Sequence, residues 1–297
     1  MKKLAYTNSK GDSITFDRHN YLFTALTGFG EVGAEIQTQK APYQDGSTFI
    51  DVVLNERAIS FEVSILGINE SDVAHKRSRL AQVFNPKLGM GKLSYTVGTI
   101  ERVIDVVVEH VPTFMPGKDV RGRKFQRSVI DLLALNPYWR SEQERVEQLV
   151  TFSGGLTFPL ILPTIFGNQK SDAKSRIIIN DGDSPTPIEV TFEGPATSPI
   201  RIENETTGEF IEVAQNLLDG EKLWITTAFG RKRVEKIAVD GSRTNAFHYI
   251  YIDPSGAGPS SSFFQLEPGN NLLTYSTGED YEKAPVTIKF YPRYLAV

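Results

Sequence analysis

The chain has 297 residues, 40% hydrophobic and 23% charged, so it is long enough for two folded domains and too apolar for a disordered chain. A net charge of −4 gives no sign of a dedicated nucleic-acid binder, and the lack of cysteine excludes disulfides and thiolate chemistry. No stretch approaches the roughly 20 apolar residues of a membrane-spanning helix, and the N-terminus has no signal-peptide pattern.

The first half of the chain is predicted to be mostly β-strand. At residues 57–65 the sequence RAISFEVSI alternates apolar and polar side chains, which is the period of a half-buried strand. Segments 101–111 and 124–135 are rich in β-branched residues and predict two more strands. The segment between them contains proline and glycine and predicts a long hairpin loop.

One helix is predicted, at residues 71–84, with an apolar side and a basic side. Asn69 or Ser71 can cap its start. Pro86 disfavours the helical conformation of the residue before it and ends the helix. Gly89 permits a tight turn into a following strand, so we expect one helix laid across a sheet, followed by a sharp return.

A domain boundary is predicted at residues 140–158, where a polar run follows a strand. We therefore expect a domain at 1–140, a linker at 141–158 and a second domain at 159–297. Short strands separated by turn residues predict a β-sandwich or jelly roll for the second domain. The expected strands are 176–180, 187–194, 210–214, 222–227, 247–252, 270–277 and 285–292.

The sequence predicts no catalytic, cofactor or metal site. Residues 28–33, GFGEVG, match the glycine pattern of a dinucleotide-binding loop, and Asp51 lies about 20 residues further on. That motif must open a helix within a βαβ unit, and the following segment is a poor helix that contains Pro42. We expect the glycines to shape a loop or bulge. No two histidines have metal-ligand spacing: they are His19, His75, His110 and His248.

Five basic residues gather around one loop, with Asp119 as the only acid among them. They are Lys118, Arg121, Arg123, Lys124 and Arg127. Two interpretations stay open, a solvated hairpin tip and a contact with an acidic protein surface. Direct reading of nucleic acid is not expected, because the aromatic side chains that stack on bases are nearly absent from the loop.

Four stretches, in this order, resemble the distal tail protein family of long-tailed, non-contractile bacteriophages, the siphophages. They are FNPKLGMGKLSY at 84–95, LALNPYWRSE at 133–142, FSGGLTFPLILP at 152–163, and GPATSPIRIENETTGEFIEV at 194–213 followed by EKLWITT. The similarity extends over almost the whole chain.

The resemblance implies a structural virion protein and no enzyme. It implies a mainly β fold, with an N-terminal β-sandwich flanked by one helix and a C-terminal galectin-like β-sandwich. The N-terminal domain is expected to form an oligomeric ring, usually a hexamer, which joins the tail tube protein to tail-tip or receptor-binding proteins. The expected location is the distal end of the phage tail, after synthesis in the bacterial cytoplasm. Neither a cofactor nor membrane insertion is implied.

A carbohydrate-binding module is the alternative, directed at glycan of the host cell wall. Trp224, Tyr249, Tyr251 and Tyr275 could offer faces on which sugars stack, although the core of a β-sandwich uses such aromatics too. The face of Trp224 cannot be assigned from the sequence, because Trp224 alternates with Leu223 and Ile225.

Overall fold

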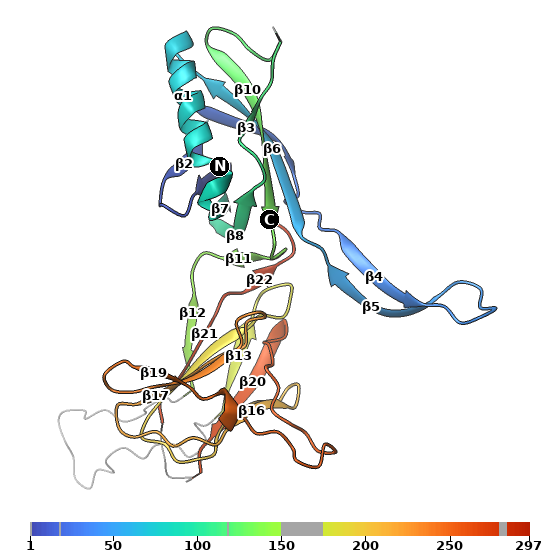
Figure 1. The fold of residues 1–297 in the computed structure, drawn as a ribbon, viewed down its shortest axis with the longest axis vertical. Coiled ribbons are helices and arrows are strands. Elements are labelled where there is room, and N and C mark those ends of the chain that lie inside the picture. Colours follow the sequence, from blue (N-terminus) through green and yellow to red (C-terminus); the bar gives the residue numbers. More distant parts are fainter. Residues whose placement is uncertain (1, 18, 118, 150–174, 279–283) are drawn as a thin grey trace, which may run out of the picture. The chain divides into compact units, whose positions relative to one another are not determined.

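The computed structural model describes residues 2–17, 19–117, 119–149, 175–278 and 284–297 (Figure 1). The chain forms two compact units. The first unit contains residues 1–142 together with 293–297, and the second contains residues 143–292. The prediction of a mainly β chain with one α-helix is confirmed.

The first unit is built on one hydrogen-bonded sheet whose main path runs β2-β1-β7-β8-β10-β6-β3. A separate pair of strands, β4 and β5, projects from it as a ribbon (Figure 1). The elements are β1 (Lys2–Thr7), β2 (Ser13–Phe16), β3 (Tyr21–Thr27), β4 (Ala34–Gln39), β5 (Thr48–Leu54), β6 (Arg57–Leu66), α1 (Glu70–Val83), η1 (Pro86–Leu88), β7 (Met90–Val97), β8 (Ile100–Val108), β9 (Thr113–Phe114), β10 (Phe125–Ala134), β11 (Trp139–Ser141) and β22 (Arg293–Tyr294).

The sheet curls so that its two ends share one core. Phe16 on β2 and Phe61 on β6 are far apart along the path of strands, yet their ring centroids lie 5.2 Å apart. The alternating residues of β6 account for this, because Ile59, Phe61, Val63 and Ile65 are all buried on the inner face. The expected N-terminal β-sandwich therefore takes the form of one curved, hydrogen-bonded sheet that folds over its own core.

Helix α1 covers part of this core and begins where the sequence predicts. The side chain of Asn69 accepts a hydrogen bond from the Asp72 N–H at 2.9 Å, so Asn69, not Ser71, is the N-cap. Leu80 and Val83 are buried against the sheet. The short helix η1 and Gly89, with φ of 75°, then turn the chain into β7.

The GFGEVG stretch forms a tight turn at the base of the ribbon, in agreement with the predicted loop. Gly28 has φ of 77°, and a β-carbon on it would lie 2.0 Å from the Ala58 carbonyl oxygen. Phe29 enters the core between Tyr95 and Trp139, with ring centroids at 5.1 and 5.5 Å. The Gly28 N–H donates to Glu31 Oε1 at 2.6 Å, and this hydrogen bond lowers the pKa of the Glu31 carboxyl.

Arg57 ties this turn to two other segments of the first unit. The side chain is 1% exposed and donates to four carbonyl oxygens. The acceptors are Pro137 at 2.7 Å, Gly28 at 3.0 Å, Glu31 at 2.9 Å and Leu295 at 2.7 Å. Burial lowers the pKa of the guanidinium, but arginine stays protonated at neutral pH. A buried charge of this kind is stable only when its donors find acceptors.

The second unit is a two-layer β-sandwich. One sheet has the order β12-β21-β14-β17-β18-β19 and the other β13-β20-β15-β16. Phe192 and Tyr275 join the layers, with ring centroids 6.5 Å apart in a shared core. The elements are β12 (Arg145–Gln148), β13 (Ser175–Asn180), β14 (Ile188–Glu193), β15 (Ile200–Asn204), β16 (Glu209–Val213), β17 (Lys222–Thr226), β18 (Arg233–Ile237), β19 (Arg243–Asn245), η2 (Phe247–Tyr249), β20 (Gly269–Ser276) and β21 (Val286–Phe290).

Three predicted ranges need correction, and strands β15, β18 and β19 lie where no strand was predicted. Strand β12 lies inside the expected linker 141–158, where it pairs with β21 as a polar edge strand; residues 150–158 of that range lie outside the described residues. The expected second domain includes residues 293–297, which instead return to the first unit, where β22 pairs with β11. The expected strand at 247–252 is wrong: residues 247–249 form η2, which follows a hydrogen bond from the Phe247 N–H to Asn245 Oδ1 at 2.9 Å, and Ile250 makes an isolated β-bridge with Val213.

Replacing Gly28 by alanine tests the turn at the base of the ribbon. Gly28→Ala is expected to lower the free energy of unfolding by about 2 kcal/mol or more, because the methyl group meets the Ala58 carbonyl and the positive φ is strained. Gly30→Ala is the matched control, since a β-carbon there has no neighbour within 4 Å. Urea unfolding of both variants measures the difference; equal losses would contradict the proposed constraint.

Candidate protein–protein interface

The predicted basic loop is a tight, hydrogen-bonded turn at the start of β10. The Arg127 N–H donates to the Val120 carbonyl at 2.8 Å, and the Gly122 N–H donates to the Phe125 carbonyl at 2.9 Å. The Lys124 carbonyl accepts from the Gly67 N–H at 2.8 Å, which fixes the turn to the end of β6. These hydrogen bonds fix the conformation of the loop backbone, and the basic side chains of the loop are exposed to solvent.

The structure brings four of the five predicted basic residues together on this turn. Arg121, Arg123, Lys124 and Arg127 are exposed, and Lys118 lies outside the described residues. Within the described part of the chain, no ion pair joins any of the four to a carboxylate. The cluster thus carries four charges that solvent or a partner must balance. Its contact with an acidic partner stays a prediction.

The ribbon β4–β5 is a second exposed surface of the same unit, and sequence reasoning missed it. Ile36 lies opposite Val52, and Thr38 lies opposite Phe49, so these side chains share one face. The exposed fractions on that face are 64% for Ile36, 63% for Phe49 and 47% for Val52. The run TFIDVVL at 48–54 has the β-branched residues of a strand, and this pattern could have predicted β5 from the sequence.

The opposite face of the ribbon is mixed, with the acids Glu35 and Asp51 beside Val53, which is 49% exposed. Glu35 lies opposite Val53, and Gln37 lies opposite Asp51. Between residues 34 and 54 the acids are Glu35, Asp45 and Asp51, against the single base Lys40. An isolated two-stranded ribbon is marginal in water, and an uncovered apolar face marks a contact site.

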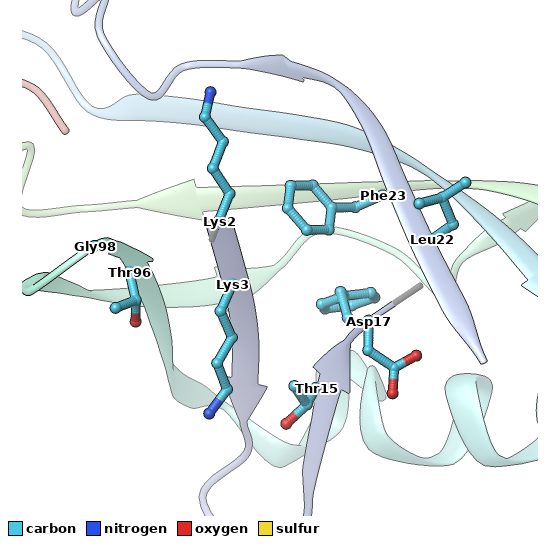
Figure 2. Close-up of a pocket in the computed structure, with 9 residues that line it drawn as sticks. Lys2, Lys3, Thr15, Asp17, Leu22, Phe23, Thr96 and Gly98 are labelled. Atoms are coloured by element: carbon cyan, nitrogen blue, oxygen red, sulfur yellow. The ribbon is translucent and has the colours of Figure 1, made fainter. Parts of the chain in front are cut away.

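A groove opens in the first unit where the curled sheet fails to close between β1–β2 and β3. Its volume is about 640 Å³, and Phe16, Leu22 and Phe23 supply apolar lining. Figure 2 shows Lys2 and Lys3 extending to opposite sides of β1, with the Phe23 ring between β1 and β3. Among the described residues, β2 pairs with β1 alone and β3 pairs with β6 alone, so each wall of the groove is a sheet edge.

The structure does not assemble the aromatic residues of the carbohydrate hypothesis into one platform. Tyr275 is 3% exposed and belongs to the core. Trp224 lies on the outer face of the six-stranded sheet, with the Arg243 guanidinium 5.4 Å from its ring centroid. Tyr249 and Tyr251 follow the edge of β16 in the other sheet, where their backbones pair with Ala214 and Glu212.

Two other classes of site were sought in the described residues. No group of three or more His, Asp or Glu side chains there is arranged to hold a metal ion. In the same residues, no helix has both the length and the apolar character needed to cross a bilayer.

Family models account for both units of the fold. Residues 9–132 match the phage tail protein RIFT-related domain. Residues 181–294 match the siphovirus-type tail component, C-terminal domain. The chain belongs to the distal tail protein family of siphophages. The resemblance carried by the four sequence stretches is thereby confirmed, and this distal tail protein is a structural component of the phage tail and baseplate.

Solved structures of low sequence identity share the fold over the whole chain. The Dit protein of phage SPP1, described as a paradigm of the hub adsorption apparatus in phages that infect Gram-positive bacteria, is 14% identical. The match covers 98% of each chain with a TM-score of 0.67. A chain of the phage P2 baseplate in its activated conformation with Ca is 11% identical, with coverage of 100% and 99% and a TM-score of 0.51. No curated protein matches the chain.

One experiment distinguishes the two interpretations of the basic loop, a solvated hairpin tip and a contact with an acidic protein surface. Replacing Arg121, Arg123 and Lys124 together by serine should leave the unfolding midpoint unchanged, because the exposed charges are screened by water and salt. If the charges face an acidic partner, the same protein assembles less completely, and raised salt has the same effect on the unmodified protein. Light scattering measures the assembly.

The control exchanges the same residues without changing charge, as Arg121→Lys, Arg123→Lys and Lys124→Arg, and should assemble normally. If the serine variant assembles normally across the salt range, the contact interpretation is wrong and the cluster is a solvated turn.

Proposed function

We propose that this distal tail protein forms a closed homo-oligomeric ring, a hexamer, at the distal end of the tail. In this proposal the first unit makes the ring. The ring joins the tail tube protein to tail-tip or receptor-binding proteins that contact the host. The protein is made in the bacterial cytoplasm, carries no cofactor and catalyses no reaction.

The uncovered apolar face of the ribbon carries this proposal. A free monomer leaves Ile36, Phe49 and Val52 in water, and burying apolar surface is favourable by about 25 cal/mol per Å². A heterologous interface that closes into a ring covers this face in every copy. The shared fold with the SPP1 hub protein and the P2 baseplate chain supports the location.

The mass of the purified protein tests the ring. At micromolar concentration we expect a species of six times the 33.1 kDa of one chain, measured by native mass spectrometry or light scattering. Phe49→Ser with Val52→Thr should shift this species toward monomer, because the apolar face is lost. Phe229→Ser is the control, since Phe229 is 89% exposed in the second unit. A strictly monomeric wild type, also in the presence of tail partners, would overturn the proposal.

A further inference from the structure

We propose that the outer face of the six-stranded sheet in the second unit binds a neutral saccharide around Trp224. The site consists of the indole ring of Trp224, the hydroxyl of Thr191, and the carboxylate of Glu235 with the two arginines that hold it. This inference concerns the second unit alone and does not rest on the proposed ring. It adds a ligand-binding activity to the structural role of the protein.

Trp224 is an aromatic side chain in the middle of a polar sheet face. It lies on β17 between Leu223 and Ile225, whose side chains are buried in the core, so the indole ring lies on the outer face. Its neighbours on the adjacent strands are Thr191 on β14 and Glu235 on β18. Trp224 is only partly buried and does not belong to the core of the second unit.

The indole N–H of Trp224 is available to a ligand. It donates to no acceptor within the described residues, and it is not one of the buried polar atoms that lack a partner, so it is open to water. The Arg243 guanidinium lies 5.4 Å from the ring centroid, whereas the guanidinium of Arg201 lies 3.6 Å from the centroid of the Phe210 ring. Arg243 therefore does not stack closely on the indole ring.

Two arginines hold the Glu235 carboxylate beside the ring. Arg243 Nη1 lies 3.0 Å from Glu235 Oε2, and Arg233 Nη1 lies 3.5 Å from Oε1. The side chain of Glu235 is 15% exposed, whereas those of Arg233 and Arg243 are 66% and 57% exposed. The carboxylate is thus fixed in place, and both guanidinium groups keep exposed N–H donors. Groups that are already ordered lose little entropy when a ligand binds.

This set of groups fits the chemistry of a saccharide. A pyranose ring has C–H bonds on its face and hydroxyl groups around its rim. The C–H bonds pack on an aromatic face, which carries negative charge density, and the hydroxyl groups both donate and accept hydrogen bonds. Adjacent strands lie about 4.8 Å apart, so Thr191 and Glu235 flank Trp224 at that spacing. Both lie within reach of the hydroxyl groups of one sugar stacked on the indole ring.

A peptide strand and a polyanion fit this face less well. Strand β17 pairs with β14 on one side and with β18 on the other, so it offers no edge for an added strand. The acids around Trp224 are paired with bases of the same face. Glu235 pairs with its two arginines, and Glu193 pairs with Lys222 at 2.6 Å. This balance of charge favours a neutral ligand.

Tryptophan fluorescence of the full-length protein tests the site. The chain has two tryptophans, and Trp139 is fully buried in the first unit, so a change caused by a sugar reports on Trp224. The probes are the methyl glycosides of glucose, galactose, N-acetylglucosamine and rhamnose, each titrated to about 100 mM. At least one should change the emission saturably, with a Kd of about 1 mM, and should protect Trp224 from quenching by iodide.

Ligand-observed NMR with four variants locates the binding site. Trp224→Ala should abolish saturation transfer to the sugar. Thr191→Val and Glu235→Gln keep the indole ring and should each weaken binding about tenfold, because each removes or weakens a hydrogen bond. Valine suits a strand, so Thr191→Val keeps the test valid if Trp224→Ala fails to fold. Tyr251→Ala is the matched control, since Tyr251 is 39% exposed beside the other sheet, and should bind as the wild type does.

Three results would overturn the proposal. The first is unchanged Trp224 emission with no saturation transfer for any of the neutral glycosides. The second is binding that persists in a folded Trp224→Ala protein, or at full strength in both Thr191→Val and Glu235→Gln, because the sugar would then lie elsewhere. The third is a response to glucuronate and to none of the neutral glycosides, which would mean an anionic ligand.

Discussion

The layout of the first unit depends on the hydrogen bonds of one buried guanidinium. Arg57 begins β6 and donates to carbonyls from the turn after β3, from the corner before β11 and from the C-terminal segment. These segments are far apart in the sequence, and Arg57 provides a common centre for all of them. The hydrogen bond to Gly28 is buried and the other three are partly buried, so losing the guanidinium donors would destabilise this arrangement.

This anchor explains how a thin ribbon can serve as a contact element. A two-stranded ribbon has no core of its own, so its direction depends on its base. The base is fixed by Gly28, by the Phe29 ring in the core and by the carbonyls that Arg57 holds. The strands beyond it then expose Ile36, Phe49 and Val52 on one face, and Glu35 and Asp51 beside Val53 on the other. The residues that fix the base of the ribbon are thus different from the residues that its strands expose.

Local patterns predicted much of the fold. The alternation in RAISFEVSI gave β6 because its period of two is set by one strand, and Asn69 and Pro86 marked the ends of α1 through their own backbone preferences. Local patterns could not predict which strands pair when they lie far apart in the sequence. Residues 145–148 are polar and form a strand only because β21 offers an edge. Residues 293–294 join the first unit only because β11 and Arg57 lie there. Of the site, the basic turn was visible as a charge cluster, whereas the groove exists only after the sheet has curled.

Hydrogen–deuterium exchange of an Arg57→Met protein tests the anchoring role most directly, because methionine keeps much of the packing and removes every donor. The account predicts faster amide exchange in residues 28–33, 136–139 and 293–297 together, while exchange in the second-unit sandwich remains as in the wild type. Unchanged exchange in these three segments would contradict the claim that Arg57 holds them in place.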